Sequence, residues 1–228
     1  MRMPFLLLLE TSSKNCSVAI ADEQQVILAK SASADHFIHA EQLHVMMNEL
    51  FTESTLRPDS LHAVAVSKGP GSYTGLRIGV STAKGLCFAL KIPLIAIDTT
   101  EILARHAASI IHDATHFMPM IDARRMEVYS ANFDAQAKRL TADEAVIIDE
   151  NTFNNFSSGR VVLVGDGAEK CKPFLKEQMQ ILSILPSADM MHAPAIEAFH
   201  QKQFEDVAYF EPFYLKDYIP GTSRKSVL

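Results

Sequence analysis

A glycine-rich turn at residues 69–75 is the feature of this sequence with the clearest chemical potential. It reads GPGSYTG and stands between a short apolar run and a long segment with helical spacing. Glycine lets the backbone approach another group closely, and the N–H groups at a helix N-terminus attract anions. The turn therefore predicts either a phosphate site or a purely structural joint, because its spacing matches neither the P-loop nor the dinucleotide-binding pattern.

A pair of histidines offers a second candidate, a metal site. His112 and His116 stand four residues apart, which is the spacing that places two ligands on one face of a helix. The glutamate that follows the first histidine of a zinc-protease helix is absent, and a strand pattern begins directly after His116. We therefore expect no metal site here.

A densely charged turn lies between two predicted strands in the second half of the chain. Its arginines could hold a phosphate, or its opposite charges could simply stabilise a hairpin. The sequence contains no Gly-x-Ser-x-Gly elbow and no Ser-His-Asp order, so a serine nucleophile is unsupported and no catalytic residue is assigned. The charged residues of this turn are Asp122, Arg124, Arg125 and Glu127.

The composition indicates a folded and mildly acidic protein. Its 228 residues, 48% of them hydrophobic, can bury a substantial core, and 21 Lys and Arg stand against 27 Asp and Glu. Without a net basic field, the chain is not expected to collect nucleic acid unaided. Three scattered cysteines argue against a disulfide framework and a zinc ribbon. The apolar run at 4–9 is too short for a signal peptide or a membrane span, so we expect a cytoplasmic protein without membrane contact.

The first hundred residues predict the elements that would position the glycine turn. Apolar runs separated by polar turns indicate a three-stranded meander, and helical spacing follows, with Asp35 as the expected N-cap. In the second helix, Gly79, Ala83 and Gly85 are expected on one face, where small residues allow close packing. The expected strands are 5–10, 16–21, 25–29, 61–67 and 94–97, and the expected helices are 35–51 and 76–90.

The second half of the chain follows the same order of elements more loosely. Two lobes of similar order indicate an internal duplication, although no repeat is visible at the level of residues. We place the boundary at residue 99, with an N-terminal lobe at 1–99 and a C-terminal lobe at 100–228. The expected helices are 100–111 and 168–178, and the expected strands are 117–122, 127–133, 145–148 and 161–165.

Three segments of the sequence together resemble one protein family. They are LLLLETSSKNCSVAI at 6–20, GPGSYTGLRIG at 69–79 with AKG at 83–85, and DARRMEVY at 122–129. They are similar to the TsaB family, also called YeaZ, the bacterial partner of the tRNA threonylcarbamoyl transferase TsaD. The order and spacing hold over most of the chain, and EPFYLK at 211–216 is similar to that family's ending.

The resemblance implies a fold and a role. The fold would be an α/β, actin/Hsp70-like (ASKHA) fold, with two lobes that each contain a mixed five-stranded sheet flanked by helices. The role would be that of a non-catalytic scaffold or activating subunit in forming threonylcarbamoyladenosine in tRNA. The resemblance also implies a heterodimer with TsaD, a further partner in the small ATPase TsaE, contact with tRNA only through the complex, and a homodimer when the chain is alone.

Two departures bear on catalysis and cofactors. The metal-binding His-x-x-x-His pair of the catalytic relative would fall near Thr99 and Leu103 here, and neither residue is a metal ligand. The first strand ends in Glu-Thr-Ser, where the family usually has Asp-Thr-Ser, so ATP hydrolysis by this chain alone is doubtful. ATP or ADP with magnesium remains a weak expectation, with Glu10, Thr11, Gly165 and Gly167 as its contacts.

The resemblance also implies that the first two helices of the N-terminal lobe form the partner surface. The glycine turn then serves to begin and pack the second helix, and a bound anion becomes the minor interpretation. Ordinary core packing is the alternative for these apolar residues. Two other functions stay open, an ATPase or small-molecule kinase of the same fold and a glycoprotease-like metallopeptidase, which the missing histidine pair disfavours. The expected contact residues are His39, Leu43, Met46, Met47, Leu50, Leu76, Gly79 and Ala83.

Overall fold

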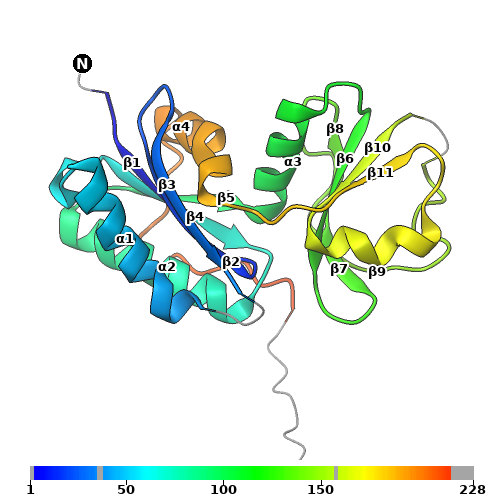
Figure 1. Ribbon diagram of the computed structural model, residues 1–228, viewed down its shortest axis with the longest axis horizontal. Helices are drawn as coiled ribbons and strands as arrows, with labels where there is room; N and C mark the ends of the chain where they lie inside the picture. The colour runs from blue at the N-terminus through cyan, green and yellow to red at the C-terminus, as the bar shows by residue number, and fades with distance from the viewer. Residues whose placement is uncertain (1–2, 35–37, 157–158, 217–228) are drawn as a thin grey trace, which may run out of the picture.

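The computed structural model describes residues 3–34, 38–156 and 159–216, and it consists of two α/β lobes with one sheet each (Figure 1). The strand order is β3-β2-β1-β4-β5 in the first sheet and β11-β10-β6-β7-β9 in the second, where β8 additionally pairs with β6. Five strands were expected in each sheet, and the second sheet has six. Among the described residues, no helix is both long enough and apolar enough to cross a membrane.

The first sheet is an antiparallel meander extended by two parallel strands. Its central strand β1 is a continuous run of leucines, and every residue of it is buried. A strand covered on both faces needs no alternation of apolar and polar residues, which explains this run. The strands are β1 (Leu6–Glu10), β2 (Asn15–Ala21), β3 (Val26–Ser33), β4 (Ala63–Gly69) and β5 (Leu94–Asp98).

Helices cover both faces of the first sheet. On one face lie α1 (His39–Ser54) and α2 (Tyr73–Leu90), side by side, and on the other lies α4 (His192–His200) after the short helix η3 (Ala188–Met191) (Figure 1). A further short helix, η1 (Pro58–Ser60), precedes β4. The expected N-cap Asp35 lies outside the described residues, and α1 begins at His39 with Ile38 at its N-cap position.

The second lobe differs from the expectation in three places. The expected strand at 127–133 is divided into β7 and β8, and the expected helix at 168–178 is a shorter 3₁₀ helix that contains Pro173. A proline lacks the N–H that an α-helix needs at this position. The strand β11 was not expected. The strands are β6 (His116–Asp122), β7 (Glu127–Ser130), β8 (Phe133–Asp134), β9 (Glu144–Ile147), β10 (Val161–Val164) and β11 (Met179–Leu182), and the helices are α3 (Thr99–Ile110) and η2 (Asp166–Phe174).

The C-terminal part of the chain returns to the first lobe. The N–H of Glu205 donates to the carbonyl of Leu94 at 2.8 Å, and the N–H of Phe213 donates to the carbonyl of Lys68 at 2.7 Å. Helix α4 packs on β1 and β5. Residues from both the beginning and the end of the chain therefore pack on the first sheet. The domain boundary at residue 99 stays a prediction.

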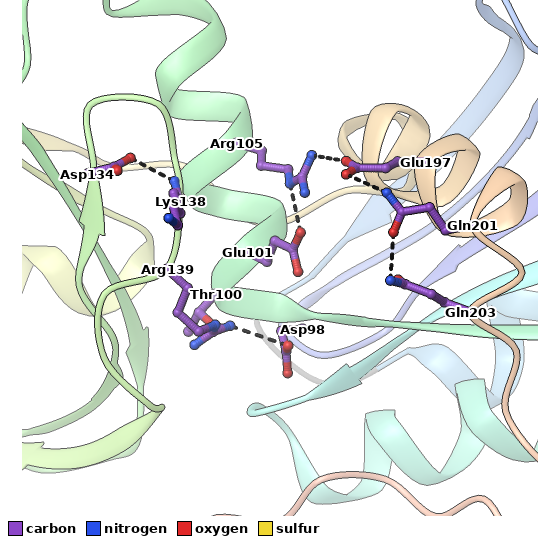
Figure 2. A network of polar contacts seen from close by, with 10 residues as sticks. All are labelled: Asp98, Thr100, Glu101, Arg105, Asp134, Lys138, Arg139, Glu197, Gln201 and Gln203. Carbon is purple, nitrogen blue, oxygen red and sulfur yellow. Dashed lines mark hydrogen bonds and ion pairs between the residues drawn. The ribbon is translucent and has the colours of Figure 1, made fainter.

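Two arginines on the second-lobe side connect the lobes through polar contacts (Figure 2). Arg105 on α3 is 2.7 Å from Glu101 and 2.7 Å from Glu197 on α4. Arg139 is 3.0 Å from Asp143 and 3.4 Å from Asp98, at the end of β5. Together these contacts fix α3 and the loop that precedes β9 against the first lobe.

Candidate functional site

The glycine turn joins the start of α2 to the loop between β1 and β2. The N–H of Ser72 donates to the carbonyl of Ser12 at 2.6 Å, and the N–H of Gly75 donates to Ser72 Oγ at 3.2 Å. Two of the N–H groups that would attract an anion thus have acceptors within the protein. These contacts favour the structural interpretation of the turn.

Three glycines make this joint close enough to form. A Cβ atom on Gly71 would lie 2.3 Å from the carbonyl oxygen of Ser12, and one on Gly75 would lie 2.0 Å from that of Thr11. A Cβ atom on Gly79 would lie 2.2 Å from Thr11 Oγ1. Because real Cβ atoms do not approach backbone atoms so closely, a side chain at Gly71 or Gly75 would force the turn or the start of α2 away from the β1–β2 loop, and one at Gly79 would displace the side chain of Thr11.

Glu10, the first of the residues expected to contact a nucleotide, lies inside this joint. It is completely buried, and its Oε1 accepts the N–H of Ser12 at 2.6 Å. Burial raises the pKa of its carboxyl because it disfavours the charged form, and hydrogen bonds from Ser12 and Ser67 oppose this rise. Without a neighbouring cation, the surroundings of Glu10 thus favour the neutral form of its carboxyl group.

Gly165 and Gly167 lie against the backbone of the second sheet. Cβ atoms on them would lie 2.5 Å and 2.8 Å from the carbonyl oxygen of Met120, so these glycines also serve close packing. Among the described residues, no hydrogen bond or ion pair joins them to Glu10 or Thr11. Nucleotide binding at these four residues stays a prediction.

The eight residues expected to contact a partner are all buried within the chain itself. Most of their side chains pack α1 and α2 on the first sheet, whereas Met47 also lines the groove between the two helices, and their role as contact residues stays a prediction. The apolar stripe that was assigned to the partner is the face that packs on the sheet. Whether these two helices form the interface stays a prediction. The eight residues are His39, Leu43, Met46, Met47, Leu50, Leu76, Gly79 and Ala83.

The opposite sides of the same two helices form an open groove of about 430 Å³. Gly85 lines it on α2, and a Cβ atom there would meet no other atom within 4 Å. The sequence suggested that Gly85 shares a face with Gly79 and Ala83. In the structure it lies on a different side of the helix. Phe88, one turn further along α2, is 81% exposed. The residues that line the groove are His44, Met47, Ser81, Thr82, Gly85 and Leu86.

The sequence contained a signal for this groove that was missed. Ser81, Gly85 and Phe88 recur every three or four residues and so mark one side of α2. Gly79 and Ala83 mark another side, because they lie about 120° or more around the helix from Gly85. Gly79, Ala83 and Gly85 were expected on one face, and the structure places Gly85 on the side that lines the groove.

The remaining candidates from the sequence also have definite positions. His112 lies beyond the end of α3 and His116 begins β6, so the pair shares no helix. Within the described ranges, no group of three or more His, Cys, Asp or Glu side chains is placed to hold a metal ion. In the charged turn, Asp122 pairs with Lys170 at 2.8 Å and Glu127 pairs with Lys216.

Comparison with known proteins connects this geometry to a family. The family model of TsaD, tRNA N6-adenosine threonylcarbamoyltransferase, matches residues 30–214. The tRNA threonylcarbamoyladenosine biosynthesis protein TsaB of Escherichia coli is 29% identical over 221 residues, which are 93% of this chain and 94% of that protein. The protein of the same name from Bacillus subtilis is 30% identical over 200 residues, 84% of this chain and 75% of that one.

The structure agrees with these matches. The crystal structure of YeaZ from Pseudomonas aeruginosa superposes with a TM-score of 0.81 and 25% sequence identity, and the match covers 93% of this chain and all of that one. The two-lobed, actin/Hsp70-like α/β fold that the resemblance implied is therefore confirmed. The chain belongs to the TsaD family, and within it to the TsaB (YeaZ) group.

Proposed function

We propose that the chain is a non-catalytic subunit of the complex that forms threonylcarbamoyladenosine in tRNA, and that it pairs with a TsaD-type transferase. The relatives named TsaB support the pathway. The observation that carries the pairing is the groove between α1 and α2, which stands open beside the exposed Phe88. An exposed aromatic next to an apolar groove is typical of a surface that binds another protein.

The groove is suited to a helix of the partner. Ser81 and Gly85 are small, so a partner helix can approach the backbone of α2 closely. Phe88 can then enter a pocket of the partner as an aromatic anchor. The same side of α2 carries both a projection and a depression, so two copies of the chain can pair symmetrically when no partner is present.

We also propose roles for the other expected partners. TsaE would join the assembled pair, and a cytoplasmic location would bring the complex to its tRNA. The positions that match the metal-binding histidines of the catalytic relative are occupied by Thr99 and Leu103, which supports a division of labour in which the partner carries out the chemistry.

Reconstitution tests this proposal. The purified chain is mixed with tRNA, a threonylcarbamoyl-adenylate donor and its cognate TsaD-type subunit, and modified adenosine is quantified after digestion of the tRNA. We expect modification only when both proteins are present. Modification by the chain alone would contradict the non-catalytic role, and full modification without the chain would contradict a requirement for it.

An ATPase or small-molecule kinase is the alternative within the same fold. It would need an ionised Glu10 that is open to magnesium, whereas the carboxyl group is completely buried and burial raises its pKa. Calorimetric titration of the lone chain with ATP and magnesium separates the two functions. We expect no tight binding, and tight binding would favour the alternative.

A further inference from the structure

The turn between β6 and β7 presents two arginines to solvent. Arg124 and Arg125 are exposed and have φ angles of 69° and 50°, a region that glycine and asparagine favour over arginine. The backbone of the turn is held in place, since the N–H of Arg124 donates to Asp122 Oδ1 at 2.6 Å and the N–H of Ala123 donates to the carbonyl of Glu127 at 3.1 Å. The turn thus fixes the place from which both guanidinium groups extend.

The carboxyl groups near this turn are already engaged by other residues. Lys170 Nζ lies 2.8 Å from Asp122 Oδ1, and Lys216 pairs with Glu127. Asp166 accepts the N–H of Asp122 at 3.0 Å, and burial raises the pKa of its carboxyl. Within the part of the chain that the structure describes, the side chains of Arg124 and Arg125 form no hydrogen bond or ion pair. Their positive charges are therefore available to a ligand.

Tyr214 of the C-terminal segment contacts a tyrosine and a third arginine at the start of α2. The rings of Tyr73 and Tyr214 lie 4.8 Å apart, and the guanidinium carbon of Arg77 lies 4.2 Å from the centre of the Tyr73 ring. Arg77 Nε donates to the hydroxyl of Tyr214 at 3.2 Å, and Glu211 is the acidic residue within its electrostatic reach.

This aromatic cluster and the arginine turn belong to one surface. Lys216 follows Tyr214 by two residues and pairs with Glu127 at the base of the turn. Tyr129 on β7 lies within electrostatic reach of both Arg124 and Lys216. Figure 1 shows the C-terminal segment and the β6–β7 turn at the same lower end of the two lobes. We call Tyr73, Arg77, Arg124, Arg125, Tyr129 and Tyr214 the tyrosine–arginine surface.

We propose that the tyrosine–arginine surface binds the phosphodiester backbone of RNA directly. Guanidinium groups bind phosphate in bidentate fashion, and the half-buried rings of Tyr73 and Tyr214 offer aromatic surface on which an unpaired base can stack. Arg124 and Arg125 place two exposed positive charges next to each other although the whole chain carries a formal net charge of −6. The inference rests on the proposed function, which supplies tRNA as the RNA, and it replaces the expectation that the chain meets tRNA only through its partner.

Fluorescence anisotropy with labelled tRNA tests the inference on the complex of this chain with its TsaD-type partner. The double variant Arg124→Gln/Arg125→Gln should bind tRNA about tenfold more weakly at about 0.1 M salt, and the slope of log affinity against log salt should fall by about 1.5. The control is Lys138→Gln/Lys202→Gln, because both lysines are exposed and Lys202 shares the positive φ of the arginines. The control should stay within about twofold of the wild type.

Light scattering before each titration separates this inference from the proposed function. If the complex does not form, the proposed function fails. Titration of the lone chain with tRNA at low salt then still shows whether the tyrosine–arginine surface binds RNA. Equal affinity and equal salt slope for the double variant and the wild type would overturn the inference. A double variant that loses binding of magnesium-ATP in calorimetry while it keeps its affinity for tRNA would overturn it too, and would assign the arginines to a nucleotide.

Discussion

At the scale of single residues, the glycines of α2 have two different functions. Gly75 and Gly79 allow the helix to contact the backbone and side chain of Thr11, whereas Gly85 faces open space in the groove. The sequence predicted the glycine turn and its helix. It did not show which glycines pack against Thr11 and which one faces the groove. The separation depends on which side of the helix meets the β1–β2 loop, and only the folded chain determines that.

We predict opposite stability effects for two glycine-to-alanine variants of α2. Gly75→Ala should lower the free energy of unfolding by about 3 kcal/mol, because its methyl group meets the carbonyl of Thr11. Gly85→Ala should raise it by about 0.5–1 kcal/mol, because alanine is the better helix former and meets no atom there. Urea denaturation measures both, and equal effects of the two variants would contradict the close contact.

Glu10 gives a prediction about pH. Burial raises its pKa in the folded chain above the ordinary value of about 4.5, so the folded state binds the proton more tightly than the unfolded state. The stabilising contribution of the protonated Glu10 is therefore lost as the pH rises from about 4.5 through the pKa of the folded state. Above that pKa, Glu10 causes no further change of stability with pH. Glu10→Gln removes the loss and should raise the melting temperature at pH 7 but not at pH 4. A variant that is less stable than the wild type at pH 7 would show that the carboxylate is stabilised by its surroundings.

At the scale of elements, periodicity predicted the first lobe well and the end of the chain poorly. The five strands of the first sheet and the helices α1 and α2 correspond to long or strongly apolar segments. Strand β11 and helix α4 were missed because four residues and nine residues carry little periodic signal, and Pro194 stands in the first turn of α4. Apolar content alone did not show which side of α1 and α2 packs on the sheet, since both sides carry apolar side chains; the spacing of Ser81, Gly85 and Phe88 was the additional signal.

The burial of α1 and α2 predicts how two aspartate substitutions differ. Leu50→Asp places a charge in the core of the first lobe and should lower the free energy of unfolding by more than about 3 kcal/mol. Phe88→Asp should change it by less than about 0.5 kcal/mol, because that side chain is 81% exposed. Thermal melts followed by circular dichroism compare the two. A strongly destabilised Phe88→Asp variant would mean that the side chain packs within its own chain.

At the scale of the whole molecule, the ion pairs that connect the two lobes differ in how deeply they are buried. Arg139 pairs with the nearly buried Asp143 and also approaches Asp98. Burial raises the pKa of Asp98, and the positive charges of Lys68 and Arg139 oppose this rise. Arg105 reaches a more exposed partner, Glu197. A general fold resemblance could not have predicted these pairs, because they depend on where the C-terminal segment packs.

We therefore predict that the two arginines contribute unequally to stability. Arg139→Met leaves the nearly buried Asp143 without its counter-charge and should cost about 2 kcal/mol. Arg105→Met removes two partly exposed ion pairs, with Glu101 and Glu197, and should cost about 0.5–1 kcal/mol. Guanidinium chloride is unsuitable because it screens charge, so the comparison uses urea at low salt. The reverse order of the two costs would contradict this account of how the lobes are joined.

The affinity of the chain for its purified TsaD-type partner tests the central claim most directly. Isothermal titration is carried out with the wild type, with Phe88→Asp, and with the matched control Ile147→Asp, whose side chain is 69% exposed on β9 in the other lobe. The account predicts that Phe88→Asp weakens binding at least about hundredfold, which is typical of an anchor residue, while Ile147→Asp binds like the wild type. Unchanged affinity of Phe88→Asp, or an equal loss in both variants, would contradict the claim that the chain docks through the groove between α1 and α2.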